Sequence, residues 1–136
     1  MSTVLVIEDN DAIREEMEQI LQFEGFTVLA ADNGHSGIAL AEAHRPDVIL
    51  CDIMMPHLDG YGTLTALRGN PATAAIPFVF VSACREEADV QRGFALGADG
   101  YLTKPFTVER LLATIQEQLA GGGAGPGPKA STPGTS

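Results

Sequence analysis

Short apolar runs alternate along the chain with longer stretches in which apolar residues recur at helical spacing. The runs are rich in aliphatic and β-branched residues and are bounded by Asp, Pro or Gly, which is typical of strands buried on both faces. The longer stretches place apolar side chains three or four positions apart, which predicts helices. The five predicted strands are residues 3–7, 27–30, 47–51, 78–81 and 100–103, and each is followed by a predicted helix.

The helical pattern is strongest in the first and last of these segments, around residues 13–21 and 111–119. In the second and third segments Ala, Gly and Thr dilute the apolar stripe. Asn33 and Asp59 nevertheless stand where N-caps of these two helices are expected. Because strands and helices alternate throughout, the pattern predicts an α/β fold around a parallel sheet.

Residues 121–136 differ in composition from the rest of the chain. Six Gly and three Pro lie among these sixteen residues, with no aromatic and no aliphatic side chain larger than Ala. Such a segment cannot bury enough apolar surface to offset the entropy lost on ordering it. We therefore expect one folded domain over residues 1–120, which suits a chain of 136 residues, and a flexible Gly/Pro-rich tail or linker over residues 121–136.

The predicted domain is strongly acidic. The whole chain has eighteen Asp and Glu residues against eight Lys and Arg, a net charge of −10. Because Lys129 lies in the tail, residues 1–120 carry seven basic side chains against eighteen acidic ones, a net charge of −11. This excess argues against direct binding of nucleic acid or an anionic membrane by this chain. An attached basic domain could still supply a DNA-linked role.

Cysteine usage and the N-terminus indicate a cytoplasmic protein. Cys51 and Cys84 lie 33 positions apart and show no metal-binding spacing, so neither a disulfide framework nor a zinc site is predicted. The N-terminus lacks a basic region followed by a long apolar run, and no stretch approaches the roughly 18 apolar residues of a membrane span. We therefore expect a soluble, cytoplasmic protein.

Polar functional groups follow four of the five predicted strands. Glu8 and Asp9 come after the first strand, Asp52 after the third, Ser82 after the fourth and Lys104 at the end of the fifth. The carboxyl ends of parallel strands meet at one edge of the sheet, which is where open α/β folds bind ligands. Carboxylates gathered there repel one another, and oxygen ligands of this kind favour Mg²⁺ or Mn²⁺. The pattern therefore predicts a cation site at this edge.

Lys104 is the single lysine of residues 1–120, which contain six arginines. A compact ammonium on a long stem suits the capture of an anion such as phosphate in a tight pocket. The alternative is a lysine that only extends into water from the end of a strand. The three carboxylates at the same edge and Pro105 directly after Lys104 favour the anion-binding role.

Four motifs of the sequence are Glu8-Asp9, the string Asp52-Ile-Met-Met-Pro-His-Leu-Asp-Gly60, the pair Ser82-Ala83, and Lys104-Pro105-Phe106. Together they resemble the receiver domain of two-component response regulators, the CheY-like family. The resemblance spans residues 3 to about 120 and implies a flavodoxin-like (βα)5 fold, a doubly wound parallel sheet with strand order 2-1-3-4-5.

The resemblance implies phosphorelay chemistry. Asp52 would be the phosphoacceptor, taking a phosphoryl group from a sensor histidine kinase or a histidine phosphotransfer protein. Glu8, Asp9, Asp52 and the backbone carbonyl of Met54 would hold Mg²⁺, with Mn²⁺ as a possible substitute. Lys104 would pair with a phosphoryl oxygen. The chain would then be a regulatory phosphoacceptor and not an enzyme, with self-phosphorylation and autodephosphorylation as its only chemistry.

The resemblance also implies a conformational switch. Ser82 would bind a second phosphoryl oxygen and draw the following loop inward, which would let Tyr101 turn from an exposed to a buried rotamer. The face formed by the fourth helix, the fifth strand and the fifth helix would then signal to an output domain, to a partner protein or to a second copy in a homodimer.

Three other functions stay open at this point. A Mg²⁺-dependent phosphohydrolase also uses an Asp nucleophile on a parallel sheet, but it needs a second acid where this chain has Met54, and a substrate pocket that 120 residues hardly allow. An interaction module that is not phosphorylated would have no need of Asp9, Asp52, Ser82 and Lys104 together. A flavodoxin-type electron carrier needs a phosphate-binding loop after the first strand, which this chain lacks.

Overall fold

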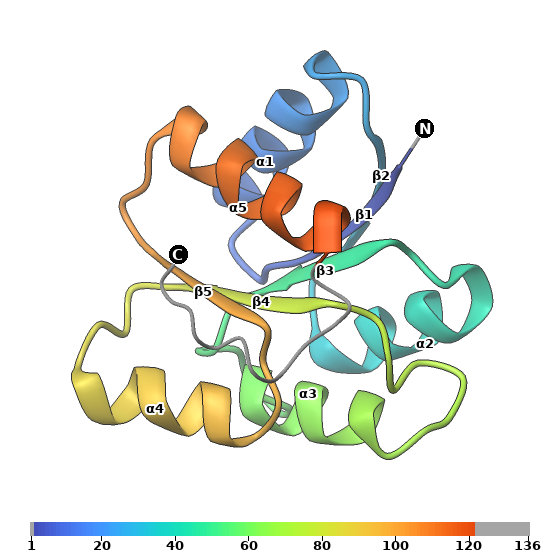
Figure 1. Ribbon diagram of the computed structural model, residues 1–136, viewed down its shortest axis with the longest axis vertical. Helices are drawn as coiled ribbons and strands as arrows, with labels where there is room; N and C mark the ends of the chain where they lie inside the picture. Colours follow the sequence, from blue (N-terminus) through green and yellow to red (C-terminus); the bar gives the residue numbers. More distant parts are fainter. Residues whose placement is uncertain (1, 122–136) are drawn as a thin grey trace.

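The computed structural model describes residues 2–121, in which five strands alternate with five helices (Figure 1). The predicted tail lies outside the described residues, apart from Gly121 at the end of the last helix. The strands are β1 Thr3–Ile7, β2 Thr27–Ala31, β3 Val48–Cys51, β4 Phe78–Ser82 and β5 Gly100–Thr103. The helices are α1 Asp11–Phe23, α2 Gly34–His44, α3 Gly60–Arg68, α4 Glu87–Ala95 and α5 Val108–Gly121.

All five strands run parallel in one sheet with the order β2-β1-β3-β4-β5. Parallel neighbours must be joined by crossovers, and here each crossover is a helix that packs back on the sheet. Helices α1 and α5 cover one face, and α2, α3 and α4 cover the other (Figure 1). The predicted flavodoxin-like, doubly wound fold is therefore confirmed.

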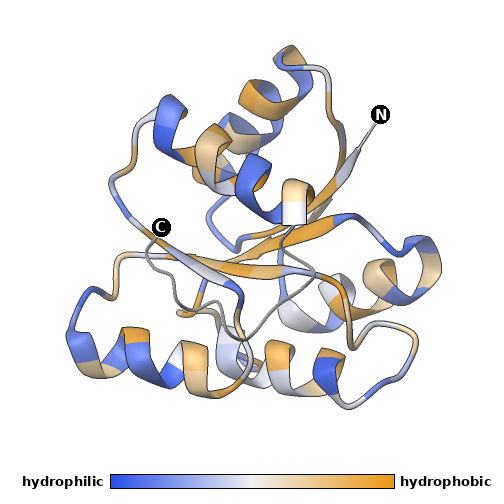
Figure 2. Cartoon of the chain, viewed as in Figure 1, coloured by the Kyte–Doolittle hydropathy of each residue, from blue (hydrophilic) through white to orange (hydrophobic). Residues whose placement is uncertain are grey.

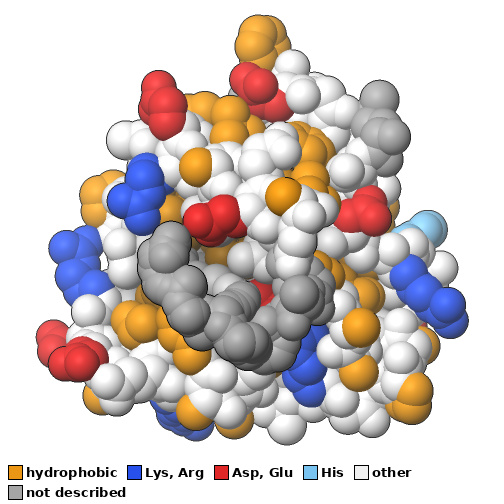
Figure 3. All heavy atoms as spheres, viewed as in Figure 1, with side chains coloured by type: hydrophobic (Ala, Val, Ile, Leu, Met, Phe, Trp, Pro, Cys, Tyr) orange, Lys and Arg blue, Asp and Glu red, His pale blue; other side chains and the backbone are white. Residues whose placement is uncertain are grey.

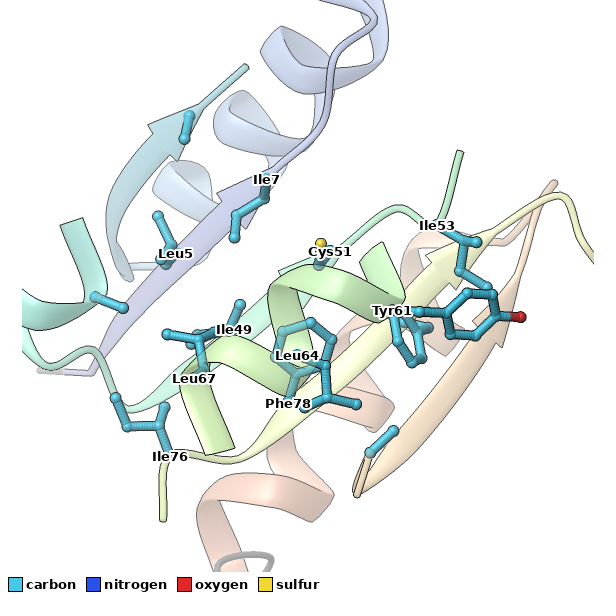
Figure 4. Packing of buried hydrophobic residues seen from close by; sticks show 14 of the residues in the cluster. Leu5, Ile7, Ile49, Cys51, Ile53, Tyr61, Leu64, Leu67, Ile76 and Phe78 are labelled. Atoms are coloured by element: carbon cyan, nitrogen blue, oxygen red, sulfur yellow. The ribbon is translucent and has the colours of Figure 1, made fainter. Parts of the chain in front are cut away.

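Two hydrophobic clusters lie on the two faces of the sheet, because side chains along a strand point to alternate sides. In β1, Val4 and Val6 pack with residues of α1 and α5, whereas Leu5 and Ile7 pack with residues of α2 and α3. The central strands are accordingly hydrophobic along almost their whole length (Figure 2). The α2–α3 side of the core, seen closely in Figure 4, includes Ile49, Tyr61, Leu64, Leu67, Ile76 and Phe78.

The prediction that every strand is buried on both faces is wrong for β2 and β5. Each of these two strands has a single buried residue, whereas all residues of β3 and β4 are buried. The reason is position, since β2 and β5 are the two edge strands and have a neighbour on one side only.

Three strand ends also differ by one residue from the prediction. Strand β3 begins at Val48, and Asp47 just before it contacts Thr3 twice: its carboxylate accepts from the Thr3 N–H at 2.7 Å, and its own N–H donates to the carbonyl of Thr3 at 2.8 Å. Strand β2 continues to Ala31, which pairs with Ile7, and β4 continues to Ser82.

The predicted N-caps of α2 and α3 are confirmed. The Asn33 side chain accepts a hydrogen bond from the Ser36 N–H at 2.8 Å, and the Asp59 side chain accepts one from the Gly62 N–H at 2.9 Å. Helix α3 can begin so close to β3 because its first residue is glycine, as a Cβ on Gly60 would lie 2.3 Å from the backbone oxygen of Asp52.

Candidate functional site

The sheet register brings the predicted site residues to one edge. Ile7 pairs with Cys51, so Glu8 and Asp52 leave the sheet side by side. The Asp52 N–H donates to the carbonyl of Ile7 at 3.0 Å, which extends this pairing by one step. In the same way the Lys104 N–H donates to the carbonyl of Ser82, at 2.9 Å. The prediction that these residues gather at the carboxyl edge is met by the geometry.

Three carboxylates converge at this edge. Glu8, Asp9 and Asp52 each offer an oxygen, and these oxygens all lie within 4.8 Å of one another. Glu8 and Asp52 are buried, at 2% and 7% exposure, whereas Asp9 is exposed. Two buried oxygen donors with a third at the surface fit the ligand preference of Mg²⁺, which takes few protein carboxylates and keeps part of its water shell.

Lys104 lies within this cluster. Its Nζ is 2.8 Å from Glu8 Oε1 and 3.3 Å from Asp52 Oδ2. Burial raises the pKa of Glu8, and the hydrogen bonds from Lys104 and from the Asn10 N–H offset this only in part. Burial alone would lower the pKa of Lys104, but the hydrogen bond to Glu8 and the charges of Asp52 and Glu8 outweigh it, so the pKa of Lys104 is raised.

The two oxygens of Asp52 have different surroundings. Oδ1 accepts a hydrogen bond from the N–H of Ile53 at 2.7 Å, while Oδ2 faces the ammonium of Lys104. The carboxylate is thereby held in one orientation, with one oxygen hydrogen-bonded to the backbone and the other paired with the Lys104 ammonium.

Ser82 and Tyr101 meet at the loop between β4 and α4. Ser82 is completely buried, and its Oγ accepts a hydrogen bond from the Cys84 N–H at 3.2 Å. Tyr101 is half-buried, with its ring centroid 6.0 Å from that of Phe80, and its hydroxyl donates to the carbonyl of Cys84. Burial raises the pKa of Tyr101 to about 12. Both predicted switch residues thus contact the same loop residue.

Met54 lies two positions after Asp52 in the loop between β3 and α3. Its side chain is 67% exposed, whereas the side chains of Ile53 and Met55 on either side are buried. Since the thioether side chain faces solvent, any part that Met54 plays at the site falls to its backbone.

Sequence reasoning assigned no role to two residues that shape this site. Asn10 caps α1 by accepting from the Ile13 N–H, and its own N–H donates to Glu8 Oε2 at 3.1 Å. Arg85 Nη2 donates to the carbonyl of Lys104 at 2.6 Å. An Asn directly before a helical pattern is a recognisable signal, but nothing in the sequence marks Arg85, whose partner lies 19 positions away.

Within the described part of the chain, no helix is long and apolar enough to cross a membrane.

Comparison with known proteins places the chain in one family. The family model described as "response regulator receiver domain" matches residues 4–116. Protein PilH of Pseudomonas aeruginosa is 40% identical over 121 residues, which cover 89% of this chain and all of PilH. The DNA-binding dual master transcriptional regulator RpaA of Synechocystis is 40% identical over 119 residues, which cover 88% of this chain but 49% of RpaA.

Solved structures agree with this placement. The chemotaxis protein CheY4 of Vibrio cholerae superimposes with a TM-score of 0.84 at 34% identity, covering 88% of this chain and 99% of CheY4. A putative response regulator from Chloroflexus aurantiacus has a TM-score of 0.83 at 30% identity. The chain spans the full length of PilH and about half the length of the transcriptional regulators it matches. With the family model matching most of its length, this chain belongs to the CheY-like receiver domains of two-component response regulators.

Proposed function

We propose that this chain is the phosphoacceptor of a two-component phosphorelay and that Asp52 receives the phosphoryl group. The observation that carries the proposal is the position of Lys104, whose ammonium lies between Glu8 and Asp52 beside three convergent carboxylates. A carboxylate nucleophile repels an anionic phosphoryl group unless positive charge stands next to it. Lys104 supplies one such charge, and a divalent cation held by the carboxylates would supply the other.

Glu8, Asp9, Asp52 and the backbone carbonyl of Met54 would hold Mg²⁺, with Mn²⁺ as a substitute. When bound, the ion offsets negative charge on the phosphoryl oxygens. An oxygen of Asp52 forms the new bond to phosphorus while the phosphorus–nitrogen bond of the donor phosphohistidine breaks. Lys104 then exchanges its contact with Asp52 Oδ2 for a phosphoryl oxygen and keeps its hydrogen bond to Glu8.

Phosphorylation would act on α4 through Ser82 and Tyr101. The Ser82 hydroxyl would donate to a phosphoryl oxygen, which moves the loop that carries Cys84, and Tyr101 would follow because its hydroxyl is bonded to that residue. Helix α4 suits such a movement, since only Gly93 of its residues is buried and its N-cap, Glu86, makes no side-chain capping hydrogen bond.

The donor would be a sensor histidine kinase or a histidine phosphotransfer protein, and signalling would take place in the cytoplasm. The α4-β5-α5 face would transmit the change to an output domain, a partner protein or a second copy of the chain. Phe94 on α4 and Val108 on α5 are partly exposed, and in the view of Figure 3 hydrophobic side chains lie among acidic and basic ones. A surface of this mixed character suits protein partners better than nucleic acid.

The chain would be a regulatory phosphoacceptor and not an enzyme acting on external substrates. The phosphohydrolase alternative needs an acid two positions after Asp52, where Met54 directs an apolar side chain into solvent. A non-phosphorylated interaction module would have no use for the buried pairing of Lys104 with Glu8 and Asp52, which costs desolvation of all three charges.

Intact-mass spectrometry after incubation with acetyl phosphate and Mg²⁺ tests the proposal. The wild-type chain and Asp59→Asn should each gain one phosphoryl group, and Asp52→Asn should gain none. Asp59→Asn is the matched control because it removes a carboxylate from the same loop while asparagine still caps α3. A wild-type chain that gains no mass, or an Asp52→Asn variant that gains as much, would overturn the proposal.

A further inference from the structure

We propose that Arg14 is a positioning residue for the cation site, because it fixes the peptide unit between Glu8 and Asp9 and thereby sets the affinity for the divalent cation. This inference rests on the proposed function, since it assumes that Glu8 and Asp9 hold the cation.

Arg14 forms two contacts at the end of β1. Its Nη1 donates to the carbonyl oxygen of Glu8 at 2.9 Å, and its Nη2 pairs with Asp11 Oδ1 at 2.7 Å. The Arg14 side chain is 16% exposed, whereas that of Asp11 is 79% exposed. Helical side chains point toward the N-terminus of their helix, so Arg14 reaches back over the first turn of α1 to the residues that precede it.

The Glu8 carbonyl belongs to the peptide unit that leads directly into Asp9. The other polar groups of Glu8 are held independently: its N–H donates to Ala31 at 3.0 Å, and its carboxylate accepts from the Asn10 N–H and from Lys104. The contact with Arg14 is therefore the one that sets the orientation of the plane between Glu8 and Asp9.

Asp9 depends on this plane more than the other two carboxylates do. Glu8 and Asp52 are buried and hydrogen-bonded, but Asp9 is exposed, and its carboxylate has no hydrogen-bond partner among residues 2–121. Among the described residues, no hydrogen bond to its side chain holds it beside the other two carboxylates, so its place there depends on the backbone that carries it and on its own rotamer. A rotation of the preceding peptide unit would carry Asp9 away from them.

The charge of Arg14 is paired with Asp11 and does not itself favour cation binding, because a guanidinium near the site repels a divalent cation. If Arg14 acted only through its charge, its removal would strengthen cation binding. If Arg14 positions Asp9, its removal weakens binding, as is typical when a residue that orients a metal ligand is lost. The two roles therefore predict changes of opposite sign.

The test is a titration of the full chain with Mg²⁺, followed by ¹H–¹⁵N NMR at the amides of Asp9 and Asn10. Arg14→Met should raise the Kd for Mg²⁺ about tenfold. Arg14→Lys keeps the charge, but a single ammonium cannot donate to both the Glu8 carbonyl and Asp11 in the way that the two nitrogens of a guanidinium do. It should therefore raise the Kd less than Arg14→Met does. Arg45→Met is the matched control, because Arg45 is an exposed arginine at the far end of α2, and its Kd should equal that of the wild type.

Each outcome decides between the alternatives. If the wild type shows no saturable Mg²⁺ binding, the proposed function fails and this inference fails with it. If the wild type binds Mg²⁺ and Arg14→Met binds it equally well or more tightly, only the role of Arg14 is overturned. If Arg14→Met has a lower melting temperature but an unchanged Kd for Mg²⁺, Arg14 contributes to stability only, and the proposal is likewise overturned. Should Arg14→Met not fold, Arg14→Lys decides, and a wild-type Kd in that variant contradicts the proposal.

Discussion

Lys104 Nζ lies 2.8 Å from Glu8 Oε1, although the two residues are 96 positions apart in the chain. They follow β5 and β1, which are not neighbours in the sheet because β3 and β4 lie between them. The lysine side chain therefore reaches back along the carboxyl edge and contacts Asp52 Oδ2 on the way. One ammonium thus pairs with two buried carboxylates.

Lys104→Met should destabilise the protein by roughly 2–3 kcal/mol, because it leaves the buried charges of Glu8 and Asp52 without a partner. Urea denaturation at neutral pH measures this loss. Lys104→Arg retains a positive charge and should recover part of the stability, but its planar guanidinium should not restore phosphorylation by acetyl phosphate. A Lys104→Met variant as stable as the wild type would show that the pairing does not balance the buried carboxylates.

Glu8→Gln should make the protein more stable and its cation site weaker. Burial raises the pKa of Glu8, which means that folding disfavours its ionised form, so a neutral side chain of the same size removes an unfavourable contribution. The gain is limited because glutamine has one side-chain oxygen for the two donors, Lys104 and the Asn10 N–H, that the carboxylate serves. We expect the melting temperature without Mg²⁺ to rise by a few degrees and the Kd for Mg²⁺ to rise roughly tenfold. Calorimetry measures both quantities.

The matched control for this substitution is Glu16→Gln, which removes the same charge from an exposed position on α1. It should leave the melting temperature and the Kd for Mg²⁺ close to their wild-type values. Equal effects of the two substitutions would indicate that overall charge, and not the site, is responsible.

Arg68→Met should cost roughly 2–4 kcal/mol of stability while leaving the site intact, because several acceptors lose their donor at once. The Arg68 guanidinium joins the loops at the edge of the sheet where β4 and β5 begin. It donates to the backbone carbonyls of Ala74, Ile76 and Gly97 and to the carboxylate of Asp99. Urea denaturation measures the loss, and acetyl phosphate should still phosphorylate the folded variant.

Arg92→Met is a suitable comparison for Arg68→Met. The Arg92 guanidinium lies 4.1 Å from the centre of the Tyr61 ring and makes a cation–π contact with it. At a partly exposed site such a contact is weaker than the set of hydrogen bonds that Arg68 makes. Its loss should cost less than about 1 kcal/mol. If both variants lose the same stability, the hydrogen bonds of Arg68 are not the cause.

Tyr101 should make the protein sensitive to alkaline pH. The pKa of its hydroxyl is raised by burial from 10.0 to about 12. Between these values the unfolded chain loses the proton and the folded chain keeps it, so the free energy of unfolding falls as pH rises through this range. Tyr101→Phe should show a shallower fall between pH 10 and pH 12 when urea denaturation is repeated at several pH values. Identical slopes would exclude Tyr101 as a source of the pH dependence.

The sequence alone was sufficient to predict the alternation of strands and helices and the gathering of Glu8, Asp9, Asp52 and Lys104, for a physical reason, whereas the strand order was implied by the resemblance to the receiver family. Buried parallel strands have continuous apolar runs, so the polar residue that ends each run marks the carboxyl edge of the sheet. The N-caps at Asn33 and Asp59 could also be predicted from the sequence, because each capping hydrogen bond joins residues only three positions apart.

The contacts between residues far apart in the chain could not be predicted in this way. The pairings of Arg85 with the carbonyl of Lys104 and of Tyr101 with that of Cys84 use backbone acceptors, which carry no signal in the sequence. The exposure of β2 and β5 also depends on strand position, because an apolar run looks the same whether its strand is central or at an edge.

Phosphorylation of Asp52 is tested best by locating the phosphoryl group on the chain. The full chain is incubated with phosphoramidate and Mg²⁺, since its phosphorus–nitrogen bond resembles that of phosphohistidine, and borohydride then reduces any aspartyl phosphate to homoserine before peptide mapping. We expect homoserine at position 52 and nowhere else, and only when Mg²⁺ is present. An unmodified Asp52, or modification at another carboxylate, would contradict it.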